Sequence, residues 1–139
     1  MQRRREDGFF ISDEKDLLDL DRIHRWLSEE SYWAAGRSME LVERSIEHSV
    51  AIGCYGPEST QVAFCRWVTD TSTFAWLCDV FVDSGFRGKG LGTFLVESAL
   101  AHPDVQGIRL LLLATRDAQG LYSKFGFVPG SAGWMERRI

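Results

Sequence analysis

The sequence predicts an α+β fold built as a single domain. Its 139 residues suffice for one hydrophobic core and are too few for two. Apolar residues recur at helical spacing in the first third of the chain, and three consecutive strand-like runs follow them. A strand–loop–helix–strand–helix order then completes the chain. We therefore expect residues 1–139 to form one domain, in which helices flank a mixed central sheet made of an antiparallel meander and this final unit.

The N-terminal part is predicted to hold one short strand and two helices. Residues 8–12 (GFFIS) are consistent with a strand, and an amphipathic pattern predicts a helix over residues 16–28. Residues 29–38 break this pattern, and Ser38 fits as the N-cap of a second helix. The apolar face of that second helix is expected to contain Leu41, Val42, Ser45 and Ile46. We interpret the basic run at residues 3–5 as a frayed, solvated terminus.

The remaining elements follow from a change of period. Residues 50–55, 61–69 and 73–82 are apolar runs with short connections, which predict an antiparallel meander. A helix over 90–102 follows and is stopped by Pro103. Residues 109–114 predict a fully buried strand, and residues 118–125 predict a short helix. Residues 126–128 begin a last extended segment towards Trp134.

Composition excludes several classes of protein. Hydrophobic residues make up 45% and charged residues 26%, which excludes a disordered chain. The net charge is −4, so a nucleic-acid partner is not expected. No apolar run is longer than five residues, as at 110–114, whereas a membrane helix needs about 20. We therefore expect no membrane partner.

Cysteine and histidine usage indicates a reduced, metal-free protein. Cys54, Cys65 and Cys78 have no C-x-x-C spacing, and each lies in an apolar run where cysteine acts as a small buried hydrophobe. The chain begins without a secretory signal, so a cytoplasmic location is expected. The three histidines are predicted to lie on helices without metal-ligand spacing, so no metal is expected; they are His24, His48 and His102.

A glycine-rich segment, residues 87–92 (RGKGLG), lies between a predicted strand and a predicted helix. Free backbone N–H groups at a helix start form an anion site, and glycine lets the backbone approach phosphate oxygens closely. The letters match neither a P-loop nor a dinucleotide fingerprint, because the glycines are spaced G-x-G-x-G. A tight turn that only begins the helix is the alternative interpretation.

The surrounding residues add a family resemblance. Residues 79–95 (DVFVDSGFRGKGLGTFL) resemble motif A of the GNAT superfamily, the Gcn5-related N-acetyltransferases, with Arg87, Gly90 and Gly92 in the three positions of R/Q-x-x-G-x-G/A. Residues 121–127 (LYSKFGF) resemble the family's L-Y-x-x-x-G-F segment. The resemblance covers residues 50–128. It implies a GNAT fold and the direct transfer of an acetyl group from acetyl-CoA to an amine, without a covalent enzyme intermediate.

The resemblance also implies where CoA binds. Backbone amides of one continuous segment would hold the pyrophosphate, namely those of Arg87, Gly88, Lys89, Gly90, Leu91, Gly92 and Thr93. The backbone of Phe81 and Val82 would pair with the pantetheine arm, and an amide near Phe81 would polarise the thioester carbonyl. Thr115 stands where many relatives have a pantetheine-binding Asn, and its hydroxyl is the group that could keep that contact. Asp117 is expected to cap the helix that begins at residue 118.

Two catalytic candidates follow from the resemblance. Tyr122 would protonate the departing CoA thiolate, because a phenol pKa near 10 is close to that of a thiol. A half-buried core position is the alternative for Tyr122. Asp79 is the candidate general base, and its apolar neighbours in the alternating pattern, Leu77 and Phe81, suggest a raised pKa. The alternative for Asp79 is that it satisfies nearby backbone groups.

The acceptor site is expected to come from the N-terminal half and to take a small-molecule or peptide amine. Four aromatic residues are candidates for its wall, and two acidic residues could attract a cationic amine: Tyr32, Trp33, Trp67, Trp76, Glu29 and Glu30. Core packing or a solvated loop is the other interpretation of all six. A homodimer is among the expected partners. The alternative function is a non-catalytic acyl-CoA-binding sensor or regulatory module.

Overall fold

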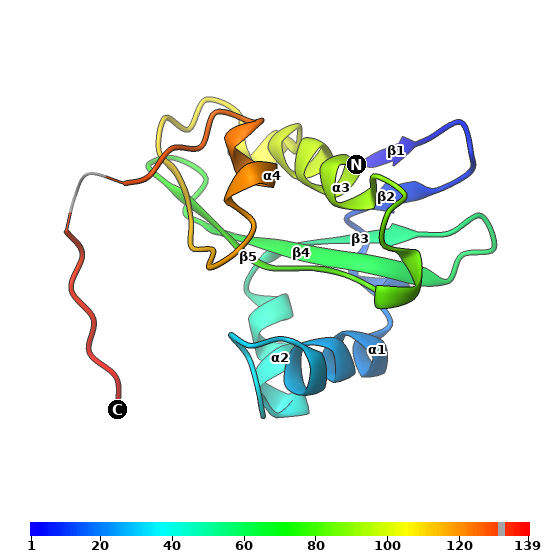
Figure 1. The fold of residues 1–139 in the computed structure, drawn as a ribbon, viewed down its shortest axis with the longest axis horizontal. Helices are drawn as coiled ribbons and strands as arrows, with labels where there is room; N and C mark the ends of the chain where they lie inside the picture. Colours follow the sequence, from blue (N-terminus) through cyan, green and yellow to red (C-terminus); the bar gives the residue numbers. More distant parts are fainter. Residues whose placement is uncertain (131–132) are drawn as a thin grey trace.

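The computed structural model describes residues 1–130 and 133–139 and has three layers. A six-stranded sheet lies between two pairs of helices (Figure 1). One face is covered by α3 (Leu91–Leu100) and α4 (Gln119–Ser123), and the other by α1 (Leu20–Arg25) and α2 (Met39–Glu47). The predicted α+β class is confirmed.

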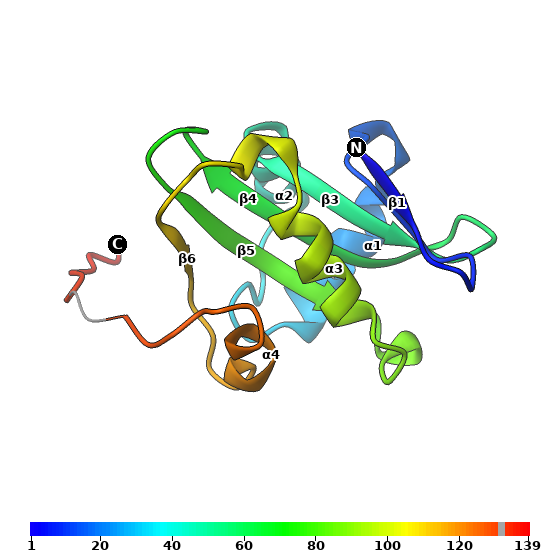
Figure 2. The ribbon, with the colours of Figure 1, turned by 90° about the horizontal axis from the view of Figure 1, so that it is seen from above.

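The strands follow one another across the sheet in chain order. They are β1 (Gln2–Arg4), β2 (Phe10–Ser12), β3 (Val50–Tyr55), β4 (Gln61–Thr69), β5 (Ala75–Val82) and β6 (Leu111–Leu113). Neighbours are antiparallel from β1 to β5, and β6 runs parallel to β5. Figure 2 shows α3 lying over β4 and β5, as expected for the helix that connects two parallel strands. The predicted meander and its final unit therefore share one sheet.

Each face of the sheet carries its own hydrophobic core. The core under α3 includes Leu95 and Val96 from the helix, which are fully buried together with Trp67 of β4. The core on the opposite face joins Ile23 of α1 and Val42 of α2 to sheet residues including Phe64. Apolar residues alternate between the two cores because successive strand residues point to opposite faces.

A β-bulge in β5 interrupts this alternation. Phe81 pairs with Phe64 and Cys78 pairs with Arg66, so two residues of β5 oppose one residue of β4. The backbone of Asp79, within the bulge, has φ +54°, a left-handed conformation that is costly for a residue with a side chain. Leu77 therefore belongs to the core under α3, whereas Phe81 belongs to the core of α1 and α2.

The N-terminal arginines are ordered, so the prediction of a frayed terminus is wrong. Residues 2–4 form an edge strand paired with β2. Arg3 donates from Nη1 to the hydroxyl of Ser98 (3.1 Å), and Arg5 donates from Nη1 to the carbonyl of Lys89 (3.0 Å). These contacts tie the terminus to α3 and to the glycine-rich loop.

The first predicted helix is divided into three pieces. A 3₁₀ turn at Lys15–Leu17 precedes α1, whose N-cap Asp19 accepts the Arg22 N–H (3.0 Å). The chain then continues as a π-helix over Trp26–Glu30. The second helix begins as predicted, because the Ser38 hydroxyl accepts the Leu41 N–H (3.2 Å). The side chain of Leu41 is exposed, however, so it does not share the buried face with Val42 and Ile46.

The C-terminal part departs most from the predictions. Strand β6 has three half-buried residues instead of a fully buried strand over 109–114. Residues 127–130 and 133–139 have no regular secondary structure, and residues 131–132 of the predicted extended segment lie outside the described residues. The indole of Trp134 lies against that of Trp76, with ring centroids 5.2 Å apart.

Candidate functional site

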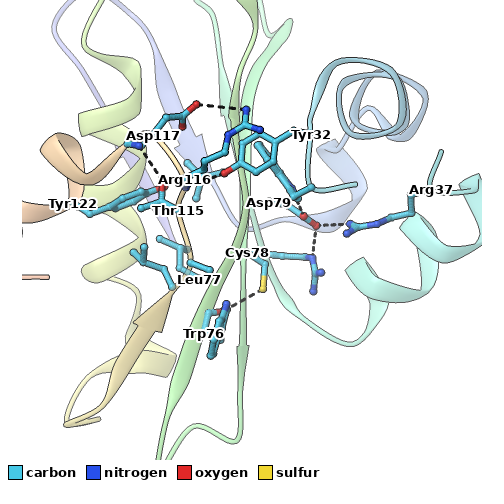
Figure 3. A pocket seen from close by; sticks show the side chains of 16 residues that line it. Tyr32, Arg37, Trp76, Leu77, Cys78, Asp79, Thr115, Arg116, Asp117 and Tyr122 are labelled. Carbon is cyan, nitrogen blue, oxygen red and sulfur yellow. Dashed lines mark hydrogen bonds and ion pairs between the residues drawn. The ribbon is translucent and has the colours of Figure 1, made fainter. Parts of the chain in front are cut away.

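Two adjoining cavities follow the edge of β5 that faces β6. Pairing between these strands ends at Leu77 and Leu113, and the exposed edge beyond that point lines both cavities. The larger, of about 540 Å³, opens beside Asp79; the smaller, of about 370 Å³, lies at the glycine-rich loop. Val80, Ala118 and Tyr122 line both. A ligand could therefore extend from the loop to Asp79. Figure 3 shows Tyr122 and Asp79 on opposite sides of the larger cavity.

The glycine-rich loop leaves the N-terminus of α3 open. Gly88 (φ +82°) and Gly90 (φ +74°) adopt left-handed conformations that favour glycine. Gly90 is the N-cap of α3 without a side-chain cap, so the first N–H groups of the helix have no acceptor from a capping side chain. The smaller cavity is lined by residues of this segment, including Leu91 and Gly92. Free amides, glycine and the helix dipole together suit a phosphate.

The cationic residues of this loop are held in defined places. Arg87 donates from Nε to the Val82 carbonyl (3.1 Å), and its guanidinium carbon lies 5.4 Å from the ring centroid of Phe81. The Lys89 carbonyl accepts the hydrogen bond from Arg5 described above. The structure thus brings the loop and the end of β5 together, although Arg87 already occupies one of the Val82 backbone groups.

Thr115 caps the turn that leads into α4. Its Oγ1 accepts the Ala118 N–H (3.0 Å), so the expectation that Asp117 caps this helix is wrong. Asp117 is exposed and pairs with Arg116 at 4.0 Å. Thr115 lines the larger cavity, and its hydroxyl hydrogen remains available for donation.

Tyr122 is buried and faces both cavities. Its ring packs edge-on against Phe127, with centroids 6.1 Å apart. Burial raises the pKa of the Tyr122 phenol to about 12, so the group is protonated at neutral pH and can act only as a proton donor there.

Asp79 is fully engaged by neighbouring side chains. Its Oδ1 accepts the Trp33 indole N–H (2.9 Å), and its Oδ2 accepts Arg37 Nη1 and Arg66 Nε (both 2.8 Å). Burial alone would raise the pKa of the Asp79 carboxyl, but Arg66 and Arg37 outweigh it and lower the pKa. The expected raised pKa is wrong, because the bulge separates Leu77 and Phe81 onto opposite faces and places two guanidinium groups on the carboxylate.

Sequence reasoning missed Arg37 and Arg66 as site residues. Arg66 stands within the apolar run 61–69, and Asp79 stands within the next strand. A charge in an apolar strand is costly unless it is paired. Opposite charges in two adjacent strands therefore indicate an ion pair between Arg66 and Asp79. Arg37 carries no such signal, because it reaches Asp79 from the loop before α2.

The expected aromatic wall is present in part. Tyr32, Trp33 and Trp76 line the larger cavity. Trp67 does not, because it is buried in the core and donates to the Ala99 carbonyl (2.9 Å). Two further candidates, Glu29 and Glu30, are exposed in the π-helix and line neither cavity.

A third arginine, Arg116, stands at the cavity beside Tyr32. Its guanidinium carbon lies 3.7 Å from the Tyr32 ring centroid, and its backbone N–H donates to the Tyr32 hydroxyl (3.0 Å). Figure 3 shows the two residues together at one end of the cavity. This double contact holds the Arg116 side chain in place although it is 67% exposed.

The cysteines divide between core and cavity. Cys54 and Cys65 are buried, as predicted, whereas Cys78 is half-buried and lines the larger cavity.

Among residues 1–130 and 133–139, no three His, Cys, Asp or Glu side chains are grouped as a metal site. Within the same residues, no helix has the length and apolar character needed to cross a bilayer.

Comparisons with known proteins agree with this arrangement. The family model described as acetyltransferase (GNAT) domain matches residues 46–129. The chain is similar to a candidate GNAT acetyltransferase from Xanthomonas campestris pv. campestris, with 43% identity, a TM-score of 0.90, and coverage of 94% of this chain and 93% of that one. A candidate acetyltransferase of Gibberella zeae is 27% identical, over 84% of this chain and 76% of that protein. A Deinococcus radiodurans structure, also a candidate acetyltransferase, shares the fold at 16% identity, with a TM-score of 0.75 and coverage of 99% and 94%.

Proposed function

Because the chain belongs to the GNAT family of acetyltransferases, we propose that it transfers the acetyl group of acetyl-CoA directly to an amine of a small molecule or peptide. One observation carries this proposal: the uncapped start of α3 lines the smaller cavity, the buried Tyr122 lines both cavities, and the two cavities adjoin along one strand edge. A phosphate group and a reacting thioester could therefore be bound at the two ends of one path.

The residues of the smaller cavity fit the phosphate end of CoA. The N–H groups from Arg87 to Thr93 would bind the pyrophosphate, with positive charge from Arg87, which lines this cavity, and from Lys89 of the same loop. Gly88 and Gly92 leave space there, because a Cβ on Gly88 would meet no protein atom within 4 Å and one on Gly92 would make only ordinary contacts. The unpaired edge of β5 at Phe81 and Val82 would hold the pantetheine arm, and Thr115 would donate its hydroxyl hydrogen to it.

In the reaction, acetyl-CoA supplies the acetyl thioester. A backbone N–H near Phe81 would donate to the carbonyl oxygen as negative charge develops on it. The amine nitrogen forms the new C–N bond while the C–S bond breaks, and the amine releases its proton to water. Tyr122 donates its proton to the departing sulfur and is then reprotonated from solvent.

Asp79 has a positioning role in this proposal. Both of its oxygens are occupied and its pKa is lowered, so it is a weak base in this setting. Its contacts instead join Trp33 and Arg37 of the loop before α2 to Arg66 of β4, and this holds one wall of the larger cavity in place.

Thermal unfolding in the presence of acetyl-CoA, followed by a screen of amine acceptors, tests the proposed function. At a hundredfold excess over Kd, we expect Tm to rise by roughly 5–10 °C. Transfer is then measured as acetyl-CoA-dependent release of free CoA in the presence of each amine. An unchanged Tm contradicts the proposal. A raised Tm without transfer to any amine favours a binding module instead.

The substitution Tyr122→Phe tests the proposed acid. We expect kcat to fall about 10²-fold or more, because general acid catalysis typically contributes that much. The rise in Tm with acetyl-CoA should persist, since the ring is retained. Because the pKa of Tyr122 is raised to about 12, its proton is lost only as the pH approaches that value. The wild-type kcat should therefore show no loss assignable to Tyr122 between pH 7 and about 10.

Tyr55→Phe is the matched control for this substitution. Among the residues that the structure describes, the Tyr55 hydroxyl has no hydrogen-bond partner, and Tyr55 lines neither cavity, so removal of this hydroxyl should leave kcat unchanged. Equal kcat values for Tyr122→Phe and the wild type would exclude Tyr122 as the acid.

A further inference from the structure

The larger cavity carries a positive charge that the acidic chain as a whole does not predict. Three guanidinium groups line it, those of Arg37, Arg66 and Arg116, against two carboxylates, those of Asp79 and Asp117. The count is three positive charges minus two negative charges, or +1. The chain itself carries −4, so the cavity has the opposite sign to the surrounding molecule.

Neither carboxylate is placed to receive a cationic substrate. The side chain of Asp79 is 2% exposed and is already paired with two arginines. Asp117 lies at the mouth with 68% of its side chain exposed, and its distance of 4.0 Å from Arg116 makes a weak pair. A cationic amine without other charges would therefore meet a surplus of positive charge here.

The arginines, in contrast, have donors to spare. Arg37 uses Nη1 on Asp79, and Arg66 uses Nε on Asp79 and Nη1 on the Ser49 hydroxyl (3.0 Å). A guanidinium group has five N–H donors, and in the described part of the chain the remaining nitrogens of these two residues have no acceptor. Both side chains reach the cavity while staying largely buried, at 22% and 13% exposure.

Arg116 adds a donor group whose direction is set by Tyr32. The guanidinium lies over the Tyr32 ring at 3.7 Å, and the Tyr32 hydroxyl holds the Arg116 backbone. Stacking of this kind fixes the plane of the guanidinium and leaves its edge free for two parallel hydrogen bonds. Carboxylates and phosphates match that edge in shape and charge.

We propose that the acceptor is an amine that also carries an anionic group, a carboxylate or a phosphate, and that the guanidinium groups of Arg37, Arg66 and Arg116 bind this group. The proposal rests on the proposed function, because it describes the second substrate of the same site. The anion would offset the positive surplus of the cavity and leave the amine free to approach Tyr122, which lies across the cavity from Asp79 and Arg37. Glu29 and Glu30 were expected to attract a cationic amine, and the local charge of this cavity reverses that expectation.

Matched pairs of amines test this proposal. The probes are 4-aminobutyrate against 4-aminobutanamide, and O-phosphoethanolamine against ethanolamine, with 1,4-diaminobutane as the dicationic comparison. Binding of each probe to the CoA-saturated protein is measured by calorimetry, which needs no turnover. We expect the member of at least one pair that carries the carboxylate or phosphate to bind about tenfold more tightly than the partner that lacks this group, as charge-assisted hydrogen bonds provide. The pair that shows the preference identifies carboxylate or phosphate.

The substitution Arg116→Gln should reduce this preference about tenfold and lower the Tm of the free protein by no more than about 4 °C, because the side chain is largely exposed and loses one stacking contact. Arg116→Lys keeps the charge but lacks the two-donor edge, so it should restore only part of the preference. Arg109→Gln is the matched control, since Arg109 is exposed and lines neither cavity. It should bind every probe as the wild type does.

The outcomes separate this inference from the proposed function. If acetyl-CoA does not raise Tm, the proposed function fails. If acetyl-CoA binds and neither probe with a carboxylate or phosphate binds more tightly than its partner, this inference alone is overturned. A preference for 1,4-diaminobutane, or a preference that survives in Arg116→Gln, overturns it as well.

Discussion

At the scale of single residues, the ion-paired Asp79 is the group that most shapes the candidate site. Three donors, from Trp33, Arg37 and Arg66, converge on one buried carboxylate. A buried ion pair adds little net stability when compared with apolar packing, but removing one partner leaves the others uncompensated. Asp79 therefore holds the side chains of the cavity wall in place, even if it transfers no proton.

We predict that Asp79→Asn lowers the free energy of unfolding by about 3 kcal/mol at pH 7, because two arginines lose their counterion. Chemical denaturation at a series of pH values measures this change. The folded-state pKa of Asp79 is lowered, so its contribution is present above about pH 4 and is lost as the pH falls through the folded value. The difference between wild type and variant should therefore shrink in acid.

Asp117→Asn serves as the control for this prediction. The Asp117 pair is exposed and 4.0 Å long, so its loss should cost less than about 0.5 kcal/mol. If the two variants had equal stability, Asp79 would not be the structural ion pair described here.

At the scale of elements, two local features build the site from ordinary secondary structure. The bulge in β5 turns Asp79 towards Trp33 and Arg37, away from the core under α3. The two left-handed glycines of the loop let α3 begin without a capping side chain, and residues of its first turn line the smaller cavity. Each feature destabilises the backbone locally. In return, the bulge positions the charge of Asp79, and the glycines leave the first backbone N–H groups of α3 without a capping side chain.

A pair of glycine substitutions separates stability from binding at the element scale. Gly92 and Gly120 both lie in helices, α3 and α4, and neither has a positive φ. Replacement of either by alanine should raise the free energy of unfolding by up to about 1 kcal/mol, because alanine is the better helix former.

Only Gly92→Ala should weaken acetyl-CoA binding, by about tenfold, because its new Cβ would enter the smaller cavity. Gly120→Ala should bind normally, since Gly120 lines neither cavity. Calorimetric titration with acetyl-CoA compares the two variants. Wild-type affinity in Gly92→Ala would mean that the pyrophosphate does not approach this turn.

At the scale of the whole molecule, one sheet joins two cores. The site lies where β5 and β6 separate, so its walls come from both layers: Trp33 and Arg37 from the side of α1 and α2, and Tyr122 from the side of α4. The relative position of these groups depends on both layers being formed. Residues 1–139 are predicted to be one domain, and the shared sheet is the physical reason to expect one cooperative unit.

One substitution in each core tests whether the domain unfolds cooperatively. Ile11→Val changes the core under α3, and Ile23→Val changes the core of α1 and α2. Each should cost about 0.5–1.5 kcal/mol, because one methylene group is lost from a fully buried side chain. The double variant should unfold in one transition, with a cost within about 0.5 kcal/mol of the sum. Two separate transitions would contradict the single cooperative domain.

Much of this protein could be predicted from its sequence, because the relevant signals are local. The spacing of apolar residues along the chain predicted six elements that the structure contains, and Ser38 was correctly predicted as a helix N-cap. These elements are β2, β3, β4, β5, α2 and α3. The two motifs at residues 79–95 and 121–127 identified the GNAT family and its fold. The roles of Tyr122 and of the glycine-rich loop remain predictions that the experiments above test.

Only the tertiary structure decided the electrostatics of the site. Three properties of the site depend on contacts between residues far apart in the chain, such as Arg37 with Asp79. They are the lowered pKa of Asp79, the positive charge of the larger cavity, and the burial of Trp67 in the core instead of the cavity wall. A bulge of one residue reversed the faces of β5, and no period of two can show this in advance. Periodicity reports which residues are buried, whereas charge depends on which residues meet, and that is set by the packing of the whole chain.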